Sequence, residues 1–355
     1  MSLDKRKVKI LKAIIASYID NAEAVGSRTI SKKFELGVSP ATIRNEMSDL
    51  EEMGFLIQPH TSSGRIPTDK AYRYYVDELW NKALGAQDKN MRQIIRIVDE
   101  EANELDSILR NSVRILSQFT KYTSFIIAPQ LKKAVIKRIQ LVPVDEKKVL
   151  LIIVMQNNIV KQVMLKLNRP IPFDQIDRIS ATLSKKLSGY MLEDINAQLK
   201  ESLIQELYHM RENAGDSLFE LVNFLSTNLG KFEDLNVYSD GITNILNLPE
   251  YNDLDKAREF ISFVEDKDSV AKLFQTENEN DMTVSIGHEN SYKELSDCSL
   301  ITATYKFNGK IIGKIGVIGP TRMDYQKVIS AVKSMSEAMN EIIDQNFAEQ
   351  DNNKE

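Results

Sequence analysis

The sequence predicts a multi-domain α+β protein that begins with a winged helix-turn-helix domain. Three observations predict this fold class. Residues 38–67, VSPATIRNEMSDLEEMGFLIQPHTSSGRIP, read as a helix, a short strand and a turn-rich loop. Strand-like runs fill residues 122–167 and 283–318, and an almost purely helical segment, residues 174–230, lies between them. Helices that interrupt a strand pattern indicate an α+β domain with a helical insertion.

The predicted recognition helix begins at Ser39 and Pro40, an N-cap followed by a proline at the first helical position. Ile43, Met47 and Leu50 then recur on one face at the 3.6-residue period of a helix. The opposite face carries small or hydrogen-bonding side chains in its first turns, where a recognition helix meets base edges. The candidate DNA-contacting residues of this helix are Ser39, Ala41, Thr42, Arg44, Asn45 and Ser48.

A wing is predicted directly after this helix. A strand at residues 55–58 leads into a loop of small and polar residues, and the chain returns through Ile66. Such a loop can approach phosphates closely or enter a minor groove. The alternative interpretation, a plain surface hairpin, stays open on the pattern alone. The candidate DNA-contacting residues of the wing are His60, Thr61, Ser62, Ser63, Gly64 and Arg65.

Positive charge gathers at the N-terminal end of the chain. Residues 1–75 hold 12 Lys and Arg against 9 Asp and Glu, whereas the whole chain has a formal net charge of −5. A basic N-terminal end on an otherwise acidic protein is typical of a nucleic-acid-binding domain joined to a further domain.

The segment VSPATIRNEMSDLEEMGFLIQPHTSSGRIPTDKAYRYYVDEL resembles the signature segment of the HrcA family of bacterial heat-inducible transcription repressors. The resemblance is densest through the recognition helix and the QPHTSSGRIPT wing, and it continues at lower density to about residue 345. It implies a winged-helix DNA-binding domain at residues 1–83 and a GAF-like domain formed by residues 88–172 and 236–347. A helical dimerisation domain, residues 173–235, is expected as an insertion in the GAF-like domain.

The resemblance also implies function and partners. It implies a sequence-specific repressor of heat-shock (chaperone) operons. Such a repressor binds double-stranded DNA as a homodimer at an inverted-repeat operator, the element called CIRCE. It further implies that the GroE chaperonin keeps the repressor active, so that misfolded protein formed in heat shock draws the chaperonin away and relieves repression.

Two segments compete as the element that makes the dimer. Residues 91–119 carry an apolar 3.5-residue repeat over about four heptads, which predicts a coiled-coil seam. The alternative is a long helix packed along a sheet, because Ala102 and Ser112 weaken the seam. Residues 174–230 carry three apolar stripes in a segment small enough to need a partner for stability. We therefore favour the insertion as the dimerisation element.

Catalytic chemistry is not indicated by the sequence. His60, His209 and His288 have no neighbouring cysteine or paired carboxylates at metal-ligand spacing, and phosphate-loop and nucleophile-elbow patterns are absent. The single cysteine, Cys298, fits a reducing cytoplasm. Neither a membrane span nor a signal peptide is apparent. We therefore predict a cytoplasmic non-enzyme without metal or cofactor. The competing hypothesis is a regulator that senses a small molecule through the GAF-like domain.

Overall fold

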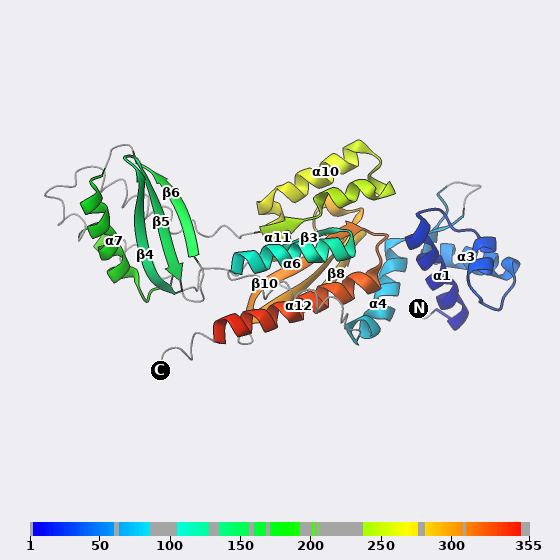
Figure 1. Ribbon diagram of the computed structural model, residues 1–355. Coiled ribbons are helices and arrows are strands. Elements are labelled where there is room, and N and C mark those ends of the chain that lie inside the picture. The colour runs from blue at the N-terminus through cyan, green and yellow to red at the C-terminus, as the bar shows by residue number, and fades with distance from the viewer. Residues whose placement is uncertain are drawn as a thin grey trace. The chain divides into compact units, whose positions relative to one another are not determined.

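The computed structural model divides into two compact units, and each is described by itself (Figure 1). The first unit holds residues 1–101, 109–127 and 237–342, and the second holds residues 102–108, 128–236 and 343–355. The structure describes residues 3–59, 64–85, 105–127, 135–155, 160–167, 171–191, 201–202, 205, 237–275, 281–307 and 310–348.

The first unit begins with the predicted winged helix. Three helices are followed by a two-stranded hairpin and a fourth helix. These elements are α1 (Lys5–Asn21), α2 (Ser27–Lys33), α3 (Pro40–Glu52), β1 (Leu56–Ile57), β2 (Ile66–Pro67) and α4 (Asp69–Gly85). Leu11 and Ile14 of α1, Ile30 of α2 and Leu50 of α3 are buried together with Leu56 of the wing. An apolar residue from each element thus contributes to one core, which holds the helices at fixed angles.

A five-stranded antiparallel sheet forms the rest of the first unit, with strand order β7-β3-β10-β9-β8. Its strands are β3 (Thr123–Ile127), β7 (Val237–Asp240), β8 (Met282–Ile286), β9 (Cys298–Phe307) and β10 (Lys310–Pro320). The strong turn signal Asn308-Gly309 predicts a hairpin between the last two strands. The pairing of β9 with β10 confirms that hairpin, although its two turn residues lie outside the described part of the chain.

Helices cover both faces of this sheet (Figure 1). On one face, Phe274 of α11 (Lys267–Gln275) packs its ring 6.0 Å from that of Phe125 in β3, and α10 (Leu254–Glu265) precedes α11. On the other face, Tyr325 of α12 (Tyr325–Ala348) lies 2.7 Å from the hydroxyl of Ser299 in β9. Short 3-10 helices complete the unit: η5 (Ile242–Asn247), η6 (Pro249–Tyr251), η7 (Gly287–Glu289) and η8 (Lys293–Leu295).

The described part of the heptad segment is α6 (Leu105–Thr120). Leu109, Ser112 and Leu116 of its stripe are buried, and the Ser112 hydroxyl lies 3.3 Å from the sulfur of Met339 in α12. This half of the segment therefore packs within its own unit, as the alternative of a helix along a sheet expects. Residues 91–104 lie outside the described residues.

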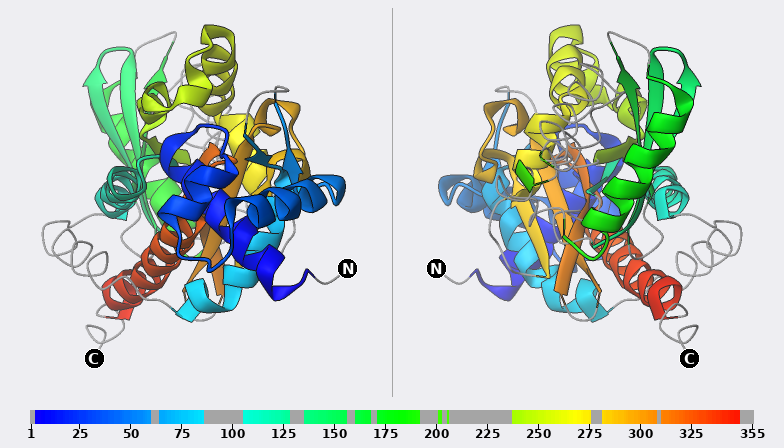
Figure 2. Two further views of the ribbon diagram at one scale, coloured as in Figure 1. Left: turned by 90° about the vertical axis from the view of Figure 1, so that its right-hand side faces the viewer. Right: turned by 90° about the vertical axis from the view of Figure 1, so that its left-hand side faces the viewer.

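The second unit contains a three-stranded antiparallel sheet and one described helix. Its elements are β4 (Ile136–Asp145), β5 (Lys148–Met155), β6 (Val160–Lys166) and α7 (Phe173–Leu187), with strand order β4-β5-β6. The right-hand view of Figure 2 shows α7 lying along these strands. Ile176, Ile179, Leu183 and Leu187 of α7 are buried, which confirms the first apolar stripe predicted for residues 174–230. Most of the other two stripes lie outside the described residues.

The grouping of the strands differs from the sequence prediction. The sequence predicts one domain from residues 88–172 and 236–347, with an insertion at residues 173–235. In the structure, β4, β5 and β6 pair only with one another among the described strands, and they belong to the unit that holds residues 128–236. Strand periodicity shows which residues form strands but carries little information about their partners, which explains the difference.

Candidate nucleic-acid interface

The local sequence of α3 explains its orientation. The Ser39 hydroxyl accepts a hydrogen bond from the backbone N–H of Thr42 at 3.2 Å, and Pro40 occupies the first helical position. Ile43 and Leu50 are completely buried, and Met47 is 4% exposed. One face of α3 is therefore anchored in the core, and this leaves the opposite face to solvent.

The structure brings the predicted contacts of this helix onto that solvent face. Ser39, Ala41, Arg44, Asn45 and Ser48 are exposed, and Thr42 is half-buried with its hydroxyl 3.0 Å from that of Ser39. Arg44 forms no ion pair with any residue that the structure describes. Its guanidinium and the Asn45 amide are therefore available to hydrogen-bond an external partner.

Three of the four acidic residues of α3, namely Glu46, Asp49 and Glu51, are by contrast paired with cations from neighbouring elements. The Lys7 ammonium of α1 lies 2.7 Å from the Glu46 carboxylate and 2.9 Å from that of Asp49. These hydrogen bonds, chiefly the one to Glu46, raise the pKa of Lys7. The pairs fasten α1 to the recognition helix and offset negative charge that would repel phosphates.

The base of the wing is held by backbone pairing and one ion pair. The backbones of Val25 and Arg65 exchange two hydrogen bonds of 2.9 Å. A Cβ added to Gly64 would lie 2.5 Å from the carbonyl atoms of Val25, so only glycine permits this approach. Arg65 Nε lies 2.7 Å from the Glu51 carboxylate, which ties the wing to α3. The remaining predicted wing contacts, His60, Thr61, Ser62 and Ser63, lie outside the described residues.

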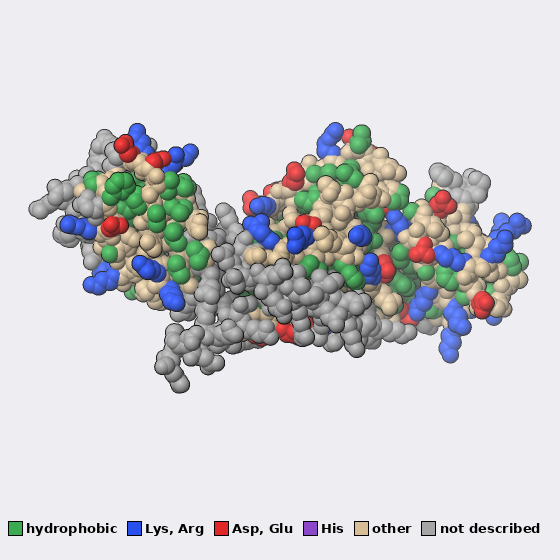
Figure 3. Space-filling model, in the orientation of Figure 1, with side chains coloured by type: hydrophobic (Ala, Val, Ile, Leu, Met, Phe, Trp, Pro, Cys, Tyr) green, Lys and Arg blue, Asp and Glu red, His purple; other side chains and the backbone are tan. Residues whose placement is uncertain are grey.

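Two further cations of the winged helix were missed by the sequence reasoning. Arg28 and Lys32 of α2 are exposed, and neither has an ion-pair partner in the part of the chain that the structure describes. Their i, i+4 spacing, visible in the sequence SRTISKK, places both on one face of the helix. The first helix of a helix-turn-helix crosses the DNA backbone, so this face is a candidate phosphate contact. Figure 3 shows Lys and Arg side chains (blue) projecting from the winged helix at the right.

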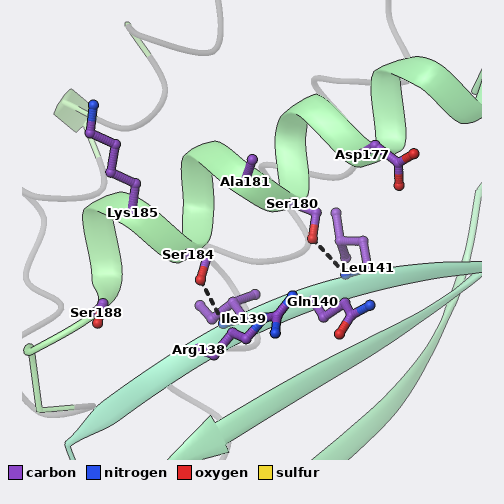
Figure 4. A pocket seen from close by; sticks show the side chains of 10 residues that line it. All are labelled: Arg138, Ile139, Gln140, Leu141, Asp177, Ser180, Ala181, Ser184, Lys185 and Ser188. Atoms are coloured by element: carbon purple, nitrogen blue, oxygen red, sulfur yellow. Dashed lines mark hydrogen bonds between the residues drawn. The ribbon is translucent and has the colours of Figure 1, made fainter.

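The second unit has a hollow between β4 and α7, with a volume of about 660 Å³ (Figure 4). Its lining is polar, and its serines are already engaged with the strand. Ser184 and Ser180 accept hydrogen bonds from the backbone N–H groups of Ile139 and Leu141 at 3.3 Å and 3.0 Å. The Ser188 hydroxyl donates to the Lys137 carbonyl at 3.1 Å. These contacts give the serine row a structural role at the edge of the sheet.

Within the described ranges, no group of three or more His, Cys, Asp or Glu side chains could hold a metal ion. Cys298 is buried, and burial raises the pKa of its thiol to about 11, so the reactive thiolate is scarce near neutral pH. None of the helices among the described residues combines the length and apolar character that a membrane span requires.

Comparisons with known families divide the chain in two. Residues 2–78 match the family described as "Winged helix-turn-helix transcription repressor, HrcA DNA-binding". Residues 106–329 match the family described as "HrcA protein C terminal domain". The first match covers α1, α2, α3 and the wing, and the second extends through the five-stranded sheet into α12.

Full-length relatives and one solved structure agree with these matches. The heat-inducible transcription repressor HrcA of Alkaliphilus metalliredigens is 41% identical over 347 residues, covering 97% of this chain and 98% of the relative. The repressor of the same name from Clostridium tetani is 40% identical over 343 residues, covering 97% and 96%. A crystal structure of a hypothetical protein at 2.2 Å resolution shares the fold, with a TM-score of 0.69 at 22% identity and coverage of 97% and 100%.

Both family matches and the near-complete alignment with these relatives point the same way. The winged helix supplies the DNA-binding domain that the first family description names. The chain therefore belongs to the HrcA family of heat-inducible transcription repressors.

Proposed function

We propose that this chain represses chaperone operons by binding an inverted-repeat operator in double-stranded DNA, as a homodimer and with sequence specificity. The observation that carries the proposal is that α3 leaves its arginine without an ion pair among the described residues, whereas most of its carboxylates are paired with cations. Arg44 stands exposed and without an ion pair among the described residues, whereas Glu46 and Glu51 are paired with cations. A helix arranged in this way offers hydrogen-bonding groups to base edges while its repulsion of phosphates is reduced.

The proposed contacts follow from the chemistry of each side chain. Arg44 and Asn45 suit bidentate hydrogen bonds to guanine and adenine, and Ala41 suits contact with a thymine methyl group. The hydroxyls of Ser39, Thr42 and Ser48 suit phosphates or base edges. Residues 60–65 of the wing are proposed to reach the DNA backbone or an adjacent minor groove.

We place dimerisation outside the winged helix, in the inserted part of the chain. Two observations support this placement. The stripe residues Leu109, Ser112 and Leu116 of α6, the described part of the heptad segment, are buried, and Ser112 contacts Met339 of α12, which removes much of the competing seam. The insertion carries two further apolar stripes in its sequence, at Leu192–Leu207 and Leu218–Leu229. Because β4, β5 and β6 belong to the second unit, we extend the proposed insertion from residues 173–235 to begin near residue 128.

We further propose that the five-stranded sheet, with helices on both faces, is the GAF-like domain. Membership of a heat-inducible repressor family supports the GroE chaperonin as the partner that keeps the protein active. A repressor must reach chromosomal DNA, so we place it in the cytoplasm and among regulators instead of enzymes. A small-molecule sensor in the GAF-like domain is the competing function. A thermal-shift screen against metabolites tests it, and a saturable rise in the unfolding temperature would favour that function.

Footprinting on genomic DNA at a stated salt concentration tests the main proposal. We expect protected inverted repeats upstream of chaperone operons, with both arms protected together. The Arg44→Ala variant should lose this protection while keeping weak non-specific binding. Protection of single, unrepeated sites, or of DNA without regard to sequence, would contradict the proposal.

A further inference from the structure

The winged helix is attached to the five-stranded sheet domain at two places, on two different helices. One attachment involves the end of α1 and the other the start of α4, which Figure 1 shows between α1 and the sheet. We call the surface formed by both attachments the junction. It consists of Ile19, Asp69, Tyr72 and Arg73 on the winged helix and of Glu250, Val284, Gly287, His288, Glu289, Arg322 and Tyr325 on the sheet domain.

The first attachment is the guanidinium of Arg322, from the turn between β10 and α12. Its Nε and Nη2 donate to the two carboxylate oxygens of Glu250 at 2.6 Å and 3.2 Å. Its Nη1 donates to the carbonyl of Ile19, in the last turn of α1. Carbonyls in that turn lack helical partners, and α1 has no basic residue of its own there. The sheet domain thus supplies a positive charge at the C-terminal end of α1.

The second attachment lies at the first turns of α4. Arg73 donates through Nε and Nη2 to the carboxylate of Glu289, and through Nη2 to the carbonyl of Val284 at 2.7 Å. The Asp69 carboxylate accepts from the backbone N–H of His288 at 3.1 Å and lies 2.8 Å from its Nδ1. A Cβ on Gly287 would lie 2.1 Å from that carboxylate, so glycine makes room for the contact.

A buried aromatic pair lies in the same junction. The rings of Tyr72 and Tyr325 lie 5.7 Å apart, and the two residues are 1% and 0% exposed. The Tyr325 hydroxyl donates to the Thr321 carbonyl and lies 2.7 Å from the Ser299 hydroxyl. Turning the winged helix on the sheet domain would break the hydrogen bond from Arg322 to the Ile19 carbonyl or the bidentate contact of Arg73 with Glu289. The two attachments and the buried contact therefore resist rotation about any single hinge.

We propose that Arg73 and Arg322 are positioning residues that set the operator spacing this repressor accepts. The proposal rests on the proposed function, in which a dimer made outside the winged helix binds an inverted repeat. The spacing between the two half-sites must then match the distance and angle between the two winged-helix domains of the dimer. The junction holds each winged helix against the sheet domain of the same chain. It therefore determines which half-site spacing is bound, whereas α3 determines which half-site sequence is bound.

The test uses full-length protein and the inverted repeat found by footprinting, with its spacer lengthened and shortened in single base-pair steps. Wild-type affinity should peak sharply at the natural spacer. In Arg322→Gln and Arg73→Gln, affinity at the natural spacer should fall about tenfold, because a poorly oriented second winged helix has a lower effective concentration. Binding at other spacers should change little, so the profile flattens, and affinity for a single half-site should stay within about twofold of wild type.

Arg258→Gln is the matched control, because Arg258 is an exposed arginine of α10 that forms an ion pair, among the described residues, only with Asp255, three residues earlier. Its spacing profile should match that of the wild type. If either junction variant unfolds, Glu250→Gln tests the first attachment and Glu289→Gln the second. A proportional loss at every spacer, or an equal loss on the half-site, overturns the inference. Failure of the wild type to bind any inverted repeat overturns the proposed function as well, so the two failures are distinguishable.

Discussion

The winged helix has two polar faces that differ in whether their side chains are already bound to other residues of the chain. On the solvent face of α3, Arg44 and Asn45 are exposed, and Arg44 has no ion pair with any described residue. At the junction, Asp69 and Arg73 are engaged by residues more than two hundred positions later in the chain. An unengaged donor keeps its bonding capacity for a ligand, whereas an engaged one has used it for internal geometry. The difference separates recognition from orientation within one small domain.

The largest effect is expected from the layer beneath the recognition face. Ile43→Ala should lower the free energy of unfolding by about 2–5 kcal/mol, because the side chain is completely buried and its loss leaves a cavity. Chemical denaturation measures the change. Ser48→Ala, on the exposed side of the same helix, is the control and should leave stability nearly unchanged. Equal stability of the two variants would mean that α3 is not anchored through Ile43.

The next effect contrasts one arginine from each face. Arg44→Ala should weaken operator binding by about 1–3 kcal/mol and leave the unfolding curve unchanged, because a base contact is lost and no internal contact is broken. Arg73→Ala should instead lower stability, because Glu289 and the Val284 carbonyl lose their donor. Quantitative binding to operator and to unrelated DNA distinguishes the roles. A parallel loss on both DNAs in Arg44→Ala would identify a phosphate contact.

Arg65 combines the two roles, because it lies in the wing, where it is a candidate DNA contact, and is also paired internally with Glu51. Arg65→Ala should lower affinity for all DNA and reduce the slope of log affinity against log salt by about 1 unit, since one phosphate contact is removed. Titrations at several salt concentrations measure the slope. Glu51→Gln is the matched variant, which keeps the guanidinium. An unchanged slope in Arg65→Ala, with lower affinity in both variants, would show that the arginine acts only by holding the wing on α3.

The smallest effect is expected at the exposed edge of the junction. The hydrogen bond to Asp69 raises the pKa of His288, and the charge of Asp297 adds to the shift. A raised pKa stabilises the folded state below the ordinary histidine value of about 6.5, and this stabilisation is lost as pH rises through the raised value. The stability difference between wild type and His288→Gln should therefore be larger at pH 5.5 than at pH 8.5. Urea unfolding at both pH values measures it, and a difference independent of pH would exclude a charged pair.

Local sequence patterns were sufficient to predict the recognition helix α3. The Ser39-Pro40 start and the spacing of Ile43, Met47 and Leu50 predict the helix and its exposed side, which the structure confirms. The strands β4, β5 and β6 lie within the strand-like run predicted for residues 122–167, and β9 and β10 form the hairpin that Asn308-Gly309 predicts. Periodicity is a local property, so it succeeds wherever neighbouring residues decide the structure.

Long-range partners could not be predicted in the same way. Nothing near β3 indicates that it pairs with β7 and β10, and the short strand β7 was missed. The contacts of Arg322 with Ile19 and of Lys7 with Glu46 join segments whose charges look ordinary in sequence. Single-sequence patterns indicate that a side chain is charged but do not identify the opposite charge it meets. The pairing of Glu46, Asp49 and Glu51 with cations, and the junction, were therefore visible only in the structure.

Ser180 and Ser184 of α7 affect how readily the edge of the three-stranded sheet can pair with another polypeptide. Unpaired backbone groups at the edge of a sheet can accept a strand from another polypeptide, and unfolded chains supply such strands in quantity. Along β4, Ser180 and Ser184 occupy the outward N–H groups of Leu141 and Ile139. Two residues after Leu141, on the same side of the strand, Pro143 has no N–H to offer. This stretch of the edge therefore has no free N–H group at Ile139, Leu141 or Pro143, which makes it a poor template for an added strand.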